Sequence, residues 1–244
     1  DRSVSRGLGD VYKRQVLECS KRHGITSVLA LAYNNIGSRY QELRQHQKAI
    51  GYFERSADEL EKVTDTENEN FQIRYLITHM NLMKSYGELD RLDDARKELL
   101  KLEKCSQGIV NEMYRYSYLT LKSRLYWNIG EKEYVYEHLD ELIKGGIDDS
   151  NAADYIEDVS DLCGLLKDMQ EFDKWKRVIL AFEQHAKKQN SIYYEMILNE
   201  MWLDYYKELG DNEQYVKLCI HYVDVAQQQK KADNEERALS LIHI

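Results

Sequence analysis

The chain has 244 residues and a formal net charge of −9 at pH 7, with 43% hydrophobic and 32% charged residues. Binding to nucleic acid requires a cluster of basic residues against the phosphates, and none is evident, so the sequence argues against nucleic acid and against an anionic membrane. Proline is absent and glycine numbers only 12, so helix-breaking residues are rare and the composition predicts an all-α protein.

The sequence has the features of a cytoplasmic protein. No apolar run approaches the roughly 20 residues of a membrane span, and the first residues lack the apolar core of a signal peptide. The four cysteines lie far apart and form no metal-ligand pair: Cys19, Cys105, Cys163 and Cys219. Isolated cysteines of this kind are typical of small core residues in a reducing compartment.

The two ends of the chain differ from its interior. Residues 1–15, DRSVSRGLGDVYKRQ, and residues 239–244, LSLIHI, resemble peptides that arise when sequencing-adapter DNA is translated in frame. Non-native segments carry no information on the fold. We therefore expect the native part to run roughly from Val16 to Ala238, as a fragment of a longer protein.

The interior reads as a series of helix pairs. Residues 16–23 have the pattern of the last turns of a helix, with Gly24 as its stop. Five predicted pairs follow: 26–43 with 45–62, 71–89 with 92–104, 111–129 with 131–144, 151–169 with 171–188, and 191–209 with 212 onward. Glycines at 130, 145, 146 and 210 are expected to end helices.

One residue pattern recurs in all five pairs. An aromatic or large residue starts it, at Tyr40, Tyr86, Tyr126, Leu166 and Tyr206, with intervals of 46, 40, 40 and 40 residues. Partners follow three, nine, thirteen and sixteen positions later, which in the first pair are Leu43, Ala49, Phe53 and Ser56. A fixed period with constant phase is the signature of a solenoid. We therefore predict an all-α, right-handed α-solenoid of antiparallel helix pairs, with about five repeats and a partial N-terminal helix.

The first pair resembles a tetratricopeptide repeat (TPR). The positions that carry the likeness are large, large, small, aromatic, small and aromatic: Tyr33, Ile36, Gly37, Tyr40, Ala49 and Phe53. In the second pair Met83 replaces the small residue, and later units keep only the phase, run to 40 rather than 34 residues and lack the closing proline. The resemblance implies that the first helices of successive units line a concave groove, which receives an extended peptide or a helix.

A second likeness concerns the C-terminal end. Residues 205–237, YYKELGDNEQYVKLCIHYVDVAQQQKKADNEER, are similar to the junction in bacterial signalling proteins between TPR-like sensor repeats and a diguanylate cyclase (GGDEF) domain. This likeness implies a repeat domain at 16–226 and a polar linker helix at 227–238, toward a cyclase domain that would lie beyond Ala238. The linker helix is also a candidate dimerisation surface. Residues 145–149, Gly-Gly-Ile-Asp-Asp, lie between two helical patterns rather than on a β-hairpin, so they are a helix stop and not a GGDEF signature.

The TPR resemblance places candidate ligand residues on the first helices. Asn35 and Asn81 stand at the groove asparagine of that family, where an amide can pair with a ligand backbone. Lys84 and Arg124 occupy matching positions that suit an acidic group, and Trp127 is placed to stack one turn further on. The alternative is structural: Asn35 bridging helices, the cations paired with local glutamates, and Trp127 in the core.

No catalytic, cofactor or metal site is predicted. The seven histidines include no HExxH, and no glycine-rich loop follows a strand. We expect a non-catalytic protein- or peptide-binding sensor or scaffold region of a bacterial signalling protein, N-terminal to a diguanylate cyclase domain. The alternative is a stand-alone peptide-binding TPR regulator or assembly adaptor. An enzyme that uses the helical array itself is a third possibility, and it would require convergent acids or a cofactor pocket.

Overall fold

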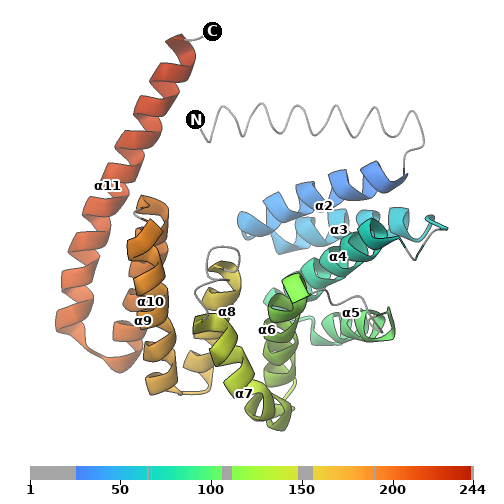
Figure 1. Ribbon diagram of the computed structural model, residues 1–244, viewed down its shortest axis with the longest axis horizontal. Helices are drawn as coiled ribbons and strands as arrows, with labels where there is room; N and C mark the ends of the chain where they lie inside the picture. Colours follow the sequence, from blue (N-terminus) through green and yellow to red (C-terminus); the bar gives the residue numbers. More distant parts are fainter. Residues whose placement is uncertain are drawn as a thin grey trace. The chain divides into compact units, whose positions relative to one another are not determined.

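The computed structural model of the chain describes residues 26–64, 66, 68–105, 112–147, 156–189 and 191–242. These residues form ten α-helices and no strand, which confirms the all-α prediction for this part of the chain (Figure 1). The helices are α2 (Thr26–Glu42), α3 (His46–Leu60), α4 (Glu69–Glu88), α5 (Leu92–Cys105), α6 (Glu112–Asn128), α7 (Lys132–Ile147), α8 (Ile156–Asp168), α9 (Phe172–Gln189), α10 (Ile192–Leu209) and α11 (Asn212–Ile242). The adapter-like leader and the predicted helix at 16–23 lie outside the described residues.

The described residues fall into two compact units. Helices α2 to α6 form the N-terminal unit, which ends at Glu131, and helices α7 to α11 form the C-terminal unit, which starts at Lys132.

Five turns between consecutive helices share one backbone geometry. The residue that turns the chain has a positive φ in each: 56° at Arg44, 58° at Asp90, 87° at Gly130, 59° at Gln170 and 72° at Gly210. In each turn the next residue donates its N–H to the carbonyl of the residue that starts the repeat pattern, as Gln45 does to Tyr40 at 2.8 Å and Asp211 to Tyr206 at 3.0 Å. The residue with the positive φ donates its N–H to the carbonyl of the residue one position after the pattern start, as Arg44 does to Gln41 at 2.8 Å. This pair of bonds is the Schellman motif, which satisfies carbonyls that a helix end leaves unpaired.

The N-terminal unit is held together by packing between neighbouring helices. Helix α4 contacts α2, α3, α5 and α6, so it is the centre of the unit. Its buried residues join those of α3, α5 and α6 in one apolar cluster: Ala49, Ile50, Phe53, Leu82, Met83, Tyr86, Ala95, Leu99 and Leu125. Each fully buried large side chain contributes about 1.5–3 kcal/mol, so this cluster is the main stabilising feature of the unit.

The C-terminal unit has its own core. Helix α9 contacts α7, α8 and α10, and α10 contacts α8 and α11. The largest fully buried side chains include Trp175 and Phe182 of α9, and the Trp175 ring meets Tyr205 of α10 edge-on at a centroid distance of 5.1 Å. Edge-to-face aromatic pairs add about 0.5–1.5 kcal/mol beyond area burial. The packing of Trp175 against Tyr205 therefore stabilises the contact between α9 and α10.

Two sequence-based expectations need correction. Gly145 and Gly146 do not end their helix, because α7 continues to Ile147; the predicted cap at residues 148–150 lies outside the described residues. The apolar residue three positions after the pattern start is not a core position in every repeat, since Leu43, Leu89 and Leu209 are exposed. These leucines sit beside the left-handed turn, where the chain leaves the first helix.

Candidate functional site

The predicted groove residues all lie on first helices of the N-terminal unit. Asn35 is on α2, Asn81 and Lys84 are on α4, and Arg124 and Trp127 are on α6. Helix α4 contacts both α2 and α6, so the three helices are neighbours. All five side chains are half-buried. The structure therefore brings the candidates to three adjoining helices, as a shared groove requires.

Asn81 takes part in a hydrogen-bond network within the unit. Its Nδ2 donates to Oδ1 of Asn34 on α2 at 3.2 Å, and the same oxygen accepts from Thr78 at 3.5 Å. The Gln41 amide adds bonds to the Asn81 carbonyl at 3.2 Å and to Ser85 Oγ at 2.8 Å. This polar seam, defined as Asn34, Gln41, Thr78, Asn81 and Ser85, joins α2 to α4.

Asn35 is not part of the polar seam. Within the described part of the chain its side chain makes no hydrogen bond, although it occupies the same repeat position as Asn81. The sequence pattern placed Asn35 and Asn81 as equivalents, whereas the structure pairs Asn81 with Asn34. Asn34 stands one position before the repeat equivalent of Asn81. A comparison of equivalent repeat positions therefore could not predict this hydrogen bond.

The cations of the same face also have partners. Lys84, Arg124 and Trp127 each have a polar, ionic or ring contact, so none of them is free. Lys122, also on α6, forms an ion pair with Glu103 of α5 at 2.7 Å and lies over the ring of Tyr126 at 5.6 Å. The face formed by α2, α4 and α6 is thus half-buried and polar, with positive charge contributed by α4 and α6.

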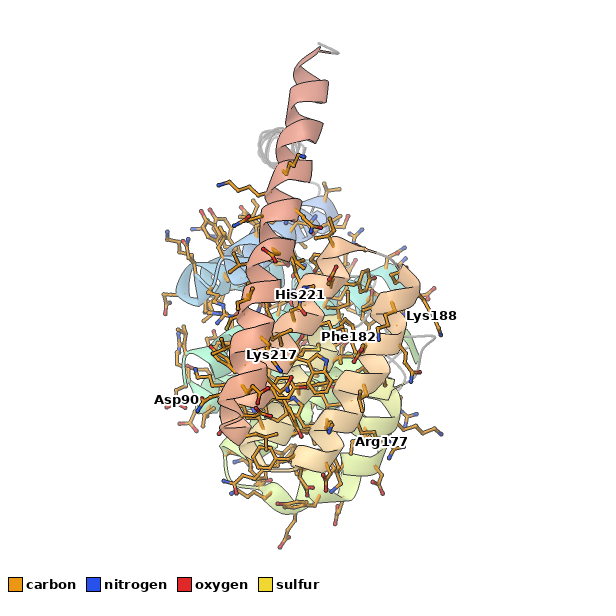
Figure 2. The ribbon with its side chains drawn as sticks, turned by 90° about the vertical axis from the view of Figure 1, so that its left-hand side faces the viewer. Asp90, Arg177, Phe182, Lys188, Lys217 and His221 are labelled. Atoms are coloured by element: carbon orange, nitrogen blue, oxygen red, sulfur yellow. The ribbon has the colours of Figure 1, made fainter. Side chains whose placement is uncertain are left out.

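A groove lies in the C-terminal unit, between α9, α10 and α11. It has a volume of about 640 Å³ and adjoins a smaller cavity with which it shares Glu183, Trp202, Leu218 and His221. A volume of this size falls within the range of ligand pockets, about 300–1,000 Å³. In Figure 2, Lys217 and His221 lie on the side of α11 that is turned to α9 and α10. We call the two adjoining cavities together the C-terminal groove.

The floor of the C-terminal groove contains a buried, unsatisfied amide. Asn199 of α10 is only 4% exposed, and its Nδ2 has no hydrogen-bond partner among the residues that the structure describes. Buried polar groups nearly always have partners, since an unpaired one costs about 1–3 kcal/mol. Sequence reasoning missed Asn199; its place between Ile192 and Trp202 on one face of α10 is the signal that could have found it.

Ion pairs line the walls of the C-terminal groove. His221 of α11 lies 3.0 Å from Glu195 of α10, and Lys187 of α9 lies 2.6 Å from Glu183. Both pairs are largely exposed, so they contribute little to stability. They give the walls charges of both signs.

A buried ionisable pair lies elsewhere, in the second helix pair. Nδ1 of His79 on α4 is 2.5 Å from Oε2 of Glu98 on α5, and Lys101 bonds the other carboxylate oxygen at 2.9 Å. The ring of Tyr75 covers His79 at a centroid distance of 4.1 Å. Both side chains are buried among packed helices, with His79 3% and Glu98 6% exposed, so we assign the pair a structural role.

The described residues show no further site chemistry. Across these ranges no cluster of three or more His, Cys, Asp or Glu side chains is placed to hold a metal ion. Burial raises the pKa of the Cys163 thiol to about 12, so this cysteine is a core residue rather than a nucleophile. None of the described helices combines the length and apolar character needed to cross a membrane.

Comparison of the sequence with protein-family models gives no match, and comparison with curated proteins gives none either.

Proposed function

We propose that the chain is a TPR-like helical solenoid that binds a protein or peptide and has no catalytic role of its own. The observation that carries this proposal is the Schellman turn repeated at residues 44, 90, 130, 170 and 210, with the same spacing as the side-chain pattern. Repetition of both turn and core residues is what a stack of equivalent two-helix units requires. Solenoids present extended surfaces, and binding is their common use.

The ligand surface in this proposal is the face of α2, α4 and α6. Lys84 and Arg124 supply positive charge to it, and Trp127 supplies an aromatic surface. A guanidinium can bind a carboxylate through two parallel hydrogen bonds, which suits an acidic side chain or a free C-terminus. The ligand is therefore a peptide segment that carries a carboxylate, and Asn35 is the amide available to its backbone.

The larger protein in this proposal is a cytoplasmic bacterial signalling protein with a diguanylate cyclase domain after the repeats. Its support is α11, which continues as one helix through the polar linker at 227–238. Val216, Ile220 and Val223 on this helix are each more than half exposed, at the spacing of a helix-pairing stripe. Ligand binding would shift the packing of the units and thereby move α11, which leads to the output domain.

The alternative is a stand-alone peptide-binding regulator or assembly adaptor. The intact gene distinguishes the two functions by the codons downstream of Arg237. A cyclase domain in the reading frame supports the signalling protein, and a stop codon within a few residues supports the regulator.

Peptide binding is tested on the full chain with an array of seven-residue peptides that end in a free carboxylate. Hits are measured by fluorescence anisotropy against the wild type and the double variant Lys84→Glu/Arg124→Glu. Hydrogen bonds to charged groups contribute about 1.5–3 kcal/mol each, so we expect the double variant to bind at least about tenfold more weakly.

The matched control is Lys62→Glu/Lys97→Glu, which makes the same charge change just after α3 and on α5 of the same unit. Both control lysines are exposed and make only local ion pairs. We expect this control to bind within about twofold of the wild type, because surface ion pairs contribute little. Equal loss in both double variants, or no peptide bound at all, would refute the assigned face.

A further inference from the structure

The C-terminal groove is a second candidate binding site, distinct from the face of α2, α4 and α6. Its floor is the stripe of α10 that includes Ile192, Asn199 and Tyr206, and its walls come from α9 and α11. On α10, Met201 occupies the position equivalent to Asn35 and Asn81. Two residues along a helix are about 200° apart, so Asn199 and Met201 lie on opposite sides of α10. The groove is therefore not a continuation of the predicted ligand face.

Among the described residues of the C-terminal unit, none accepts a hydrogen bond from the Asn199 amide. The side chain is only 4% exposed, lines the groove, and leaves Nδ2 without a partner. The adjoining floor residue is Trp202, whose ring stacks on Tyr206 at a centroid distance of 5.4 Å. The 9% of its surface that stays exposed is the apolar area that it offers to a ligand. Nδ2 itself is covered by neighbouring atoms, so the Asn199 side chain has to turn toward the groove before a ligand carbonyl can accept its hydrogen bond. An apolar group of the same ligand would then cover the exposed part of Trp202.

The dimensions of the groove fit a short extended chain. Ile192 and Tyr206 at the two ends of the floor are 14 helical steps apart, which is about 21 Å at ~1.5 Å per step. An extended chain rises about 3.3 Å per residue, so about six residues span this length.

The chemistry of the floor favours an extended chain over a helix. In an extended chain the main-chain carbonyls are free to accept hydrogen bonds, whereas in a helix they are used internally except in the last turn. A helical ligand could accept from Asn199 only through a side-chain oxygen or a carbonyl of its last turn, whereas every residue of an extended chain offers a main-chain acceptor. The lining residues Glu183, Lys187, Glu195 and Lys217 carry two charges of each sign, so the groove does not select a strongly charged segment.

We propose that the groove between α9, α10 and α11 binds an extended peptide segment of about six residues, whose main-chain carbonyl accepts a hydrogen bond from Asn199 and whose apolar side chain covers Trp202. This site is independent of the face of α2, α4 and α6, so either site can fail its test while the other stands.

The probe is an array of fifteen-residue peptides of varied sequence, of low net charge and with blocked ends, screened against the full chain. Hits are measured by fluorescence anisotropy with the wild type and with Asn199→Leu. Loss of the donor leaves a peptide carbonyl buried and unpaired, so we expect binding about tenfold weaker or more. The thermal midpoint of the free Asn199→Leu protein should be unchanged or higher, because an unpaired buried amide has been removed.

Thr120→Val is the matched control. Thr120 of α6 is fully buried, its hydroxyl is unpartnered, and it lies in the N-terminal unit. This change also removes an unpaired buried polar group, but it should leave the Kd of the same peptides within about twofold of the wild type. A further arm shortens each hit to seven residues and replaces single positions with proline. An extended ligand keeps its affinity when shortened and tolerates proline at positions whose N–H is not bonded, whereas a helical one loses affinity at interior positions.

Three results would overturn the proposal. The first is the absence of any peptide that binds more tightly than about 100 µM. The second is equal binding by the wild type and Asn199→Leu. The third is a loss of thermal stability in Asn199→Leu, which would mean that the amide has a structural role in the unit. Hits that weaken with Lys84→Glu/Arg124→Glu but not with Asn199→Leu bind the other face, and they also count against this groove.

Discussion

The ring of Phe53 on α3 packs directly against the backbone of Gly37 on α2. A Cβ added to Gly37 would lie 2.6 Å from Cε1 and 2.7 Å from Cδ1 of that ring. Phe53 is fully buried, so the ring has no space into which it could retreat. The close approach of α2 and α3 therefore depends on the absence of a side chain at position 37.

Gly37→Ala should destabilise the protein by about 1–3 kcal/mol, the usual cost of an overpacked core. Helix propensity alone predicts the opposite sign, because alanine is favoured over glycine by about 0.8–1 kcal/mol in a helix interior. The free energy of unfolding in urea decides between the two. Gly51→Ala in α3 is the control: nothing lies within 4 Å of its added Cβ, so we expect a gain of about 0.5–1 kcal/mol. A stabilising Gly37→Ala would mean that α2 and α3 can separate without cost.

The same pair of residues explains why the TPR resemblance fades along the chain. In the second helix pair Met83 replaces the small residue and Leu99 replaces Phe53, and both are buried in the same cluster. Compared with the first pair, the side chain on the first helix is larger and the one on the second helix is smaller, so the packing is kept while the family pattern is lost.

The ends of the helices were predictable from the sequence within about two residues in most cases, since the repeat phase and the turn residues mark them independently.

The details of side-chain pairing were not predictable in this way. Gly145 and Gly146 are stop signals in sequence, yet α7 continues through both, because glycine permits a helix end without requiring one. Asn81 bonds Asn34 rather than Asn35, the residue at the equivalent repeat position. Asn199 is recognised as a candidate binding residue only once α9, α10 and α11 are seen to form a groove around it. Local patterns specify helices, whereas the crossing of helices decides which side chains meet.

Asn81→Ala should lower the free energy of unfolding by about 1–2 kcal/mol, because Asn34 Oδ1 in the half-buried seam between α2 and α4 loses the shorter of its two hydrogen bonds and keeps only that from Thr78. Asn35→Ala is a matched control at the same repeat position, and we expect a change within about 0.5 kcal/mol. Urea denaturation of the full chain measures both. Equal effects of the two substitutions would contradict the assignment of Asn81 to the seam.

The repeated turns predict opposite effects of glycine and non-glycine residues at equivalent positions. Gly130→Ala places a Cβ at φ +87° and should cost about 1–2 kcal/mol. Gln170→Gly relieves the same strain at φ +59° and should stabilise the protein by about 0.5–1 kcal/mol. Thermal and urea unfolding of the two variants test this. The idea fails if Gln170→Gly destabilises by as much as Gly130→Ala.

The buried pair of His79 and Glu98 predicts a pH dependence of stability. Burial, the largest single influence, disfavours the charged carboxylate, but hydrogen bonds from His79 and Lys101 together outweigh it, so the pKa of Glu98 lies below its ordinary value of 4.5. A lowered folded-state pKa means that the charged form stabilises the fold. This contribution is complete above about pH 4.5 and is lost progressively as the pH falls through the pKa of the folded state.

Glu98→Gln removes that titration. Near pH 6 we expect the variant to be less stable than the wild type by about 1–3 kcal/mol, because a hydrogen bond to a charged acceptor is replaced by a weaker neutral one. Urea denaturation at several pH values between 6 and 3.5 should show the gap between the two proteins narrowing below pH 4.5. Glu61→Gln, which neutralises an exposed carboxylate at the end of α3, should instead track the wild type at every pH. A gap between the wild type and Glu98→Gln that stays constant over this range would show that Glu98 does not stabilise the α4–α5 pair through its charge.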